Sequence, residues 1–134
     1  MTYFLDTNIC IFYLKDMYRN LSSKLLGMPT RSVKIPSMVA AELLYGAEKS
    51  ARREYNLRIF KSFLSIYEPA PFDEHAAEYY SQIRAGLERS GGIIGGNDIV
   101  IAAIALASSG TLVTNNPSEF SRIDGLLIED WTAG

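Results

Sequence analysis

Residues 95–107 read G-G-N-D-I-V-I-A-A-I-A-L-A, and this stretch decides how the rest of the chain is interpreted. The apolar run after Asp98 is unbroken, rich in alanine and longer than a strand, so it predicts a helix buried on nearly every side. Two glycines and Asn97 mark where this helix begins, and Gly110 lies just past its end. Asp98 then either caps loose backbone N–H groups or stands at the rim of a cleft.

Length and composition predict one globular domain over residues 1–134, with 48% hydrophobic and 21% charged residues. No apolar run is long enough to span a membrane, and the N-terminus lacks the basic and apolar regions of a signal peptide. Cys10 is the single cysteine, which excludes an internal disulfide and suits the reducing cytoplasm. The formal net charge is −2, so any nucleic-acid binding must depend on a local basic patch.

Strand-like and helix-like segments alternate along the chain. Short strands are expected at 3–5, 33–35, 66–71, 111–114 and 126–128, and helices at 9–14, 18–28, 38–45, 52–64, 74–89 and 95–107. This alternation predicts an α/β fold with a mainly parallel central sheet and helices on both faces. Residues 46–50 are expected to loosen the third helix. The expected helix caps are Thr7 or Asn8, Ser37 and Asp73.

Three further acids stand apart from the ordinary charged surface. Asp6 follows the first strand, where open α/β sheets place ligands, although an acid there can also form a turn. Glu42 interrupts an apolar helical face, which is costly unless the acid is paired, metal-bound or at a cleft. The alternative is a half-exposed Glu42 on a helix that turns outward. Glu119 lies one short turn past the fourth strand.

The predicted sheet would bring these acids together, because the carboxyl ends of parallel strands share one edge. Carboxylates within about 4–6 Å of one another cannot all stay ionised without a counter-charge. Mg²⁺ or Mn²⁺ supplies one and prefers carboxylate and water oxygens, and no Cys or His cluster favours zinc. This chemistry favours phosphodiester hydrolysis by metal-activated water. The four expected site acids are Asp6, Glu42, Asp98 and Glu119.

Two other patterns allow two interpretations each. A basic cluster follows the third helix and is either a solvated face or a weak contact for an RNA backbone. An apolar seam along 74–89 indicates core packing, with a dimer face as the alternative. The cluster consists of Lys49, Arg52 and Arg53, and the seam of Ala76, Tyr80, Ile83 and Leu87.

Four blocks of the sequence together resemble the PIN domain, and in particular the VapC-type toxins of bacterial toxin–antitoxin pairs. The blocks read F-L-D-T-N-I at 4–9, A-E-L-L-Y-G-A at 41–47, G-G-N-D-I-V-I-A at 95–102 and T-N-N-P-S-E-F at 114–120. The resemblance implies a PIN-like fold and a Mg²⁺-dependent endoribonuclease.

Motif matching also implies roles for single residues. Asp6 and Asp98 would be the principal metal ligands, with Glu42 and Glu119 as the third and fourth acids. Asn116 stands where many family members carry Asp, which leaves open whether one metal ion binds or two. Further residues expected to support the site are Thr7, Asn8 and Thr114.

The resemblance further implies a homodimer, a VapB antitoxin whose tail covers the acidic site, and a structured RNA substrate. A tRNA, and specifically initiator tRNA cut in the anticodon region, is the expected target. Two alternatives are a housekeeping PIN nuclease in RNA processing and a silent module that binds a partner protein or operator DNA. A haloacid-dehalogenase-like phosphotransferase is disfavoured, because Asn8 stands where its second Asp is required.

Overall fold

Five short strands form one sheet in the order β3-β2-β1-β4-β5, and every neighbouring pair is parallel. The computed structural model describes residues 1–133. Since all neighbouring strands are parallel, the parallel sheet predicted from the sequence is confirmed. The strands are β1 (Tyr3–Leu5), β2 (Val33–Pro36), β3 (Glu68–Ala70), β4 (Thr111–Val113) and β5 (Leu127–Glu129).

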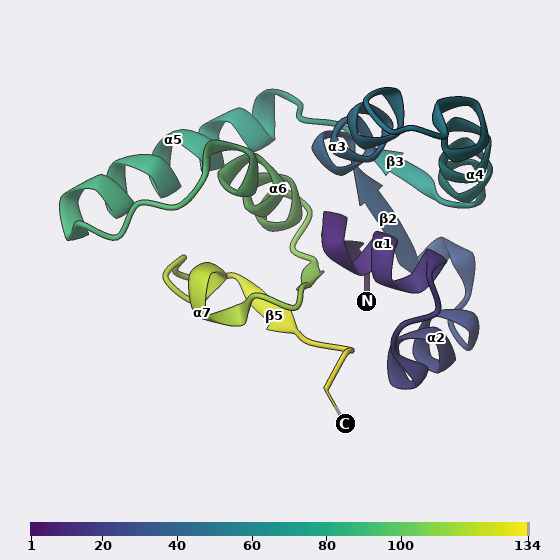
Figure 1. The fold of residues 1–134 in the computed structure, drawn as a ribbon. Helices are drawn as coiled ribbons and strands as arrows, with labels where there is room; N and C mark the ends of the chain where they lie inside the picture. The colour runs from purple at the N-terminus through teal and green to yellow at the C-terminus, as the bar shows by residue number, and fades with distance from the viewer. Residues whose placement is uncertain (134) are drawn as a thin grey trace.

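The helices connect these strands in two groups. The chain runs outward from β1 through β2 to β3 and then crosses back to β4. Because parallel crossovers are right-handed, connections in opposite directions lie on opposite faces of the sheet. Figure 1 shows α1 to α4 on one side of the molecule and α5 with α6 on the other. The elements are α1 (Thr7–Leu14), α2 (Arg19–Leu26), the 3₁₀ turn η1 (Thr30–Ser32), α3 (Ser37–Glu48), α4 (Arg53–Ile66), α5 (Glu74–Ser90), α6 (Gly96–Ala107) and α7 (Pro117–Phe120).

Two helix starts differ from the expectation. Helix α1 begins at Thr7, because Asp6 and not Thr7 or Asn8 is its cap, with Asp6 Oδ1 accepting from the Thr7 N–H at 2.8 Å. Ser37 is the first residue of α3 and not its cap, since Pro36 precedes the helix without a side-chain bond. The cap at Asp73 is confirmed. An acid at a strand end can thus serve a turn and a site together.

The expected loosening over 46–50 is confirmed for Lys49 and Ser50, where the helix has ended, but it is wrong for 46–48, because α3 continues through Gly46 to Glu48. A glycine inside a helix costs only about 1 kcal/mol relative to alanine. Leu43 and Ala47 on either side of Gly46 are buried, and their packing outweighs that cost.

Among the helices, α6 is the most buried, as its sequence predicts. It packs against α5, whose Ala76, Ile83 and Leu87 are buried within the chain. The apolar seam of α5 thus serves the core, with only Tyr80 half-exposed. Within residues 1–133, no helix has the length and apolar character needed to cross a membrane.

Candidate active site

The site forms where the strand order reverses, between β1 and β4. Open α/β sheets leave a crevice at such a point, outside the carboxyl ends of the strands. Asp6 follows β1 and Thr114 follows β4. The Asp6 N–H donates to the Val113 carbonyl at 3.0 Å, which fixes both ends at the same edge.

Asp6 is the most buried acid of the site, at 7% exposure. Its Oδ1 accepts from the Thr7 N–H and its Oδ2 from the Thr114 hydroxyl, each at 2.8 Å. Burial raises the pKa of Asp6 above its usual value, and the two hydrogen bonds lower it in part. The carboxylates of Glu42 and Glu119 raise that pKa further, so both lie within electrostatic reach of Asp6.

Glu42 is half-buried and held from two sides. The Thr7 hydroxyl donates to its Oε1 at 2.6 Å, and the Asn97 amide donates to its Oε2 at 3.3 Å. Glu42 therefore faces the site and does not turn outward. The sequence interpretation missed Asn97, which it took only as a helix start; its position next to Asp98 was the available signal.

Asp98 is the third residue of α6, and the cap position belongs to Gly95. The pKa of Asp98 is raised to about 7. Partial burial is the largest cause, and the negative charges of Asp6 and Glu119 are the next largest. A hydrogen-bonding contact with Glu119 and the charge of Glu42 add to the rise. The cleft interpretation of Asp98 is thus supported over a plain cap.

Glu119 joins the site through a chain of hydrogen bonds. The Asn116 amide donates to Glu119 Oε2 at 2.5 Å, and the Asn116 N–H donates to the Thr114 hydroxyl at 3.0 Å. That hydroxyl in turn donates to Asp6. Asn116 therefore positions an acid of this site through its amide, in place of adding a carboxylate.

The structure does not bring every expected residue to the site. The side chain of Asn8 is exposed and makes no hydrogen bond to another described residue. Cys10 is fully buried, and burial raises the pKa of its thiol, so it is a packed side chain and not a nucleophile. The single histidine, His75, lies on the surface.

The basic cluster lies away from the acids. Lys49 comes seven residues after Glu42, which is about 10 Å along a helix. Arg53 Nε lies 2.6 Å from Glu48 Oε1 and is thereby partly neutralised. Lys49 and Arg52 lie over neighbouring tyrosine rings, 4.9 and 4.0 Å from the ring centroids.

The donor set suits a hard divalent cation. None of the three ion pairs between residues 1 and 133 involves a site acid. Beyond the effect of burial, Glu42 and Glu119 are near enough to raise the pKa of Asp6 and of Asp98. No three described His, Cys, Asp or Glu side chains are already arranged around a metal position. Mg²⁺ needs no such cage, because it is often held by one or two carboxylates and keeps several waters. Asp6 and Asp98 would be the two carboxylate ligands of such an ion, and Glu42 and Glu119 would contact its waters.

Comparison with known proteins shows which family the chain belongs to. A family model described as the PIN domain matches residues 3–126. Ribonuclease VapC2 of Rickettsia felis is 43% identical, and tRNA(fMet)-specific endonuclease VapC of Salmonella typhimurium is 40% identical, each covering 98% of both chains. The crystal structure of R. felis VapBC2, bound to a promoter DNA fragment, superposes with a TM-score of 0.91 at 40% identity, covering 98% of this chain and 99% of that one. The family-model match over residues 3–126 and the relatives at 40–43% identity show that the chain belongs to the PIN domain family, among the VapC ribonucleases.

Proposed function

We propose that this protein is a Mg²⁺-dependent endoribonuclease that hydrolyses a phosphodiester bond in structured RNA, as the toxin of a VapBC pair. One observation carries the proposal. Burial raises the pKa of Asp6 and of Asp98, the charges of Glu42 and Glu119 raise both further, and no described cation is paired with these four acids. A fold gains nothing from this repulsion unless the site binds a cation.

Asp6 and Asp98 would hold the metal, with Glu42 and Glu119 as outer ligands through water. The bound ion supplies Lewis-acid stabilisation of phosphoryl charge and lowers the pKa of a water molecule. Thr7 fixes Glu42 so that one of its oxygens can orient the attacking water and accept its proton. Thr114 and Asn116 keep Asp6 and Glu119 in place.

The relatives supply the substrate and the partner. The Salmonella relative is named for cleavage of initiator tRNA, and the R. felis structure contains both VapB and VapC. We propose that this chain cuts initiator tRNA in its anticodon region. We also propose that it binds a VapB-type antitoxin in the cytoplasm. Weak contacts to the RNA backbone are proposed at the corner between α3 and α4, from Lys49, Arg52 and Arg53.

Cleavage assays test this proposal. Purified protein, an initiator tRNA transcript and Mg²⁺ should give one main cut, which EDTA abolishes and an elongator tRNA does not show. Asp6→Asn and Asp98→Asn should each lose at least about 100-fold in rate, the loss expected when one group that stabilises the transition state is removed.

The matched control is Glu78→Gln, which removes an exposed acid on α5 outside the acid site and should cleave like wild type. Persistent Mg²⁺-dependent cleavage in both site variants would disprove this site. Cleavage of every RNA at equal rate would favour a housekeeping nuclease over a toxin with one target.

A further inference from the structure

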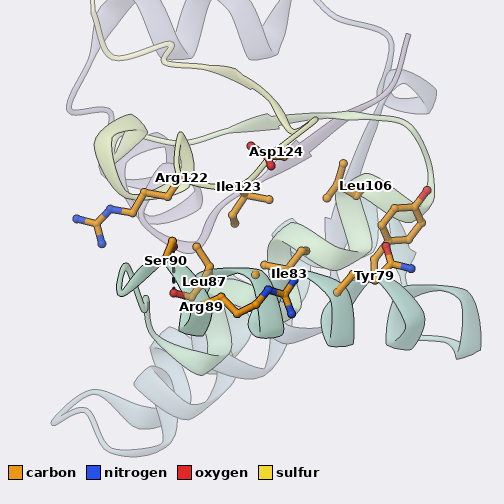
Figure 2. Close-up of a pocket in the computed structure, with 11 residues that line it drawn as sticks. Tyr79, Ile83, Leu87, Arg89, Ser90, Leu106, Arg122, Ile123 and Asp124 are labelled. Carbon is orange, nitrogen blue, oxygen red and sulfur yellow. Dashed lines mark hydrogen bonds between the residues drawn. The ribbon is translucent and has the colours of Figure 1, made fainter.

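We propose that a hollow beside the acid site, ending at Arg122, binds an RNA backbone phosphate that flanks the bond to be cut. The inference rests on the endoribonuclease function proposed above and adds to it a surface that positions the substrate. The hollow has a volume of about 420 Å³ and lies between α5 and the turn at 122–124 (Figure 2).

The hollow has an apolar floor and a polar rim. Its floor consists of side chains from α5, the end of α6 and the turn after α7. Figure 2 shows Ser90 and Arg122 at one end, and Tyr79 and Leu106 at the other. The floor side chains are Ile83, Leu87, Leu106 and Ile123. Such a floor suits a ribose or base, and the rim suits the charged backbone.

The Arg122 end of the hollow adjoins the acid site. The Arg122 N–H donates to the Glu119 carbonyl at 3.3 Å, so Arg122 directly follows the segment that carries this acid. A Cβ added at Gly92 would lie 3.5 Å from Arg122 Cδ, so the stem of Arg122 also passes close to the α5–α6 loop. That loop leads into α6 and Asp98. Arg122 therefore lies between two segments that bring acids to the site.

The charge at this end is available to a ligand. Arg122 and Arg89 are exposed and take part in none of the three ion pairs between residues 1 and 133. Asp124 also borders the hollow, but its carboxylate is not within 4.0 Å of either guanidinium. By contrast, the charge of Arg53 is already shared with Glu48.

The acid site itself creates the need for such a contact. A phosphodiester that approaches four carboxylates is repelled, and the metal offsets only the charge at the reacting phosphate. A guanidinium beside the site can hold the next phosphate by two parallel hydrogen bonds. Arg122 is placed for that contact, and Arg89 on α5 lines the same hollow.

RNA binding without cleavage is the direct test. Affinity for a fluorescein-labelled anticodon stem–loop of initiator tRNA is measured by anisotropy in EDTA, at several salt concentrations. Arg122→Ala should weaken binding at least about threefold and reduce the slope of log Kd against log salt by about 1, because one phosphate contact is lost. Arg122→Lys should restore part of the affinity. In Mg²⁺, Arg122→Ala should raise KM more than it lowers kcat.

The matched control is Arg31→Ala. Arg31 is also exposed and outside the three ion pairs, but it precedes β2 at the opposite edge of the sheet. Equal RNA affinity and equal Tm in the two alanine variants would overturn the proposal. Unchanged RNA binding with weaker antitoxin binding in Arg122→Ala would overturn it too, since the hollow would then serve a protein partner. Failure of the wild type to cleave RNA would reject the proposed function, while the EDTA measurements would still decide the hollow.

Discussion

Asp98 shows how a single residue reports on the whole site. Its pKa of about 7 lies well above the ordinary value of 3.8, and that of Asp6 is raised as well. An acid whose pKa is higher in the folded protein than in the unfolded chain binds protons more tightly when folded. Stability from this source is present at low pH and is lost as the pH rises through the folded pKa.

The free energy of unfolding of the metal-free protein should therefore fall between about pH 4 and pH 7. Asp98→Asn should make that fall shallower and should be more stable than wild type at pH 8, because it removes one repelling charge. Urea titrations at pH 5 and pH 8 measure both effects. Asp124→Asn is the control, and a less stable Asp98→Asn protein at pH 8 would show that this acid is structural.

Thr114 is the second residue on which the site depends. Thr114→Val removes the donor to Asp6 and the acceptor of the Asn116 N–H. Cleavage should fall about 10- to 100-fold, as when a partner of a metal ligand is lost, and stability by about 1–3 kcal/mol. Thr111→Val alters an equally buried threonine at the other end of β4 and should cleave at the wild-type rate. Equal activity of the two variants would contradict the role given to Thr114.

At the same scale, the sequence predicted which acids matter but not their partners. Glu42 stood out because an acid on an apolar helical face is costly, whereas Asp6, Asp98 and Glu119 were selected by their places at strand ends and at a helix start. The bond from Asn97 to Glu42 depends on how two helices meet, which no local pattern encodes.

At the scale of elements, the connection between α6 and β4 contains Gly110, whose surroundings leave no room for a side chain. A Cβ added at Gly110 would lie 2.2 Å from Cε2 of the fully buried Phe4, whereas one at Gly46 would meet no atom within 4 Å. Gly110→Ala should therefore destabilise the protein by about 1–3 kcal/mol through overpacking. Gly46→Ala should stabilise it by about 0.5–1 kcal/mol, because alanine is the better helix former. Urea midpoints that move in the same direction would contradict this packing.

Long periodic elements were predictable, and short or interrupted ones were not. The 13 residues that open on Gly95 give an unmistakable buried helix, and the structure has α6 there. Helix α7 has only four residues and no periodic pattern, so the sequence showed a loop. Gly46 misled because the tertiary packing of α3 outweighs its low helix propensity.

For the whole molecule, the resemblance predicts a homodimer. Light scattering after gel filtration of the free protein should give twice the chain mass of 14.9 kDa. A mass equal to one chain at all concentrations would reject the dimer. Three residues of the α5 seam, Ala76, Ile83 and Leu87, are already buried within the chain, which leaves only Tyr80 of that seam available to a dimer contact.

The convergence of four acids followed from topology, since alternating helices and strands put the carboxyl ends of all strands at one edge. The hollow beside Arg122 could not be predicted from the sequence. It forms between α5 and the turn at 122–124, which are distant in sequence, and no sequence pattern indicates that these two segments lie side by side. The sequence interpretation placed its basic patch at Arg52 and Arg53, the densest run, where Arg53 is paired with Glu48.

The central claim is that residues far apart in the chain gather their carboxylates around a divalent cation. A crystal of the protein grown with Mn²⁺, with anomalous data collected at the manganese edge, tests it most directly. We expect an anomalous peak within bonding distance of carboxylate oxygens of Asp6 and Asp98. We expect this peak to be absent from crystals of Asp98→Asn. A peak elsewhere, or no peak at a concentration of Mn²⁺ that supports RNA cleavage, would contradict it.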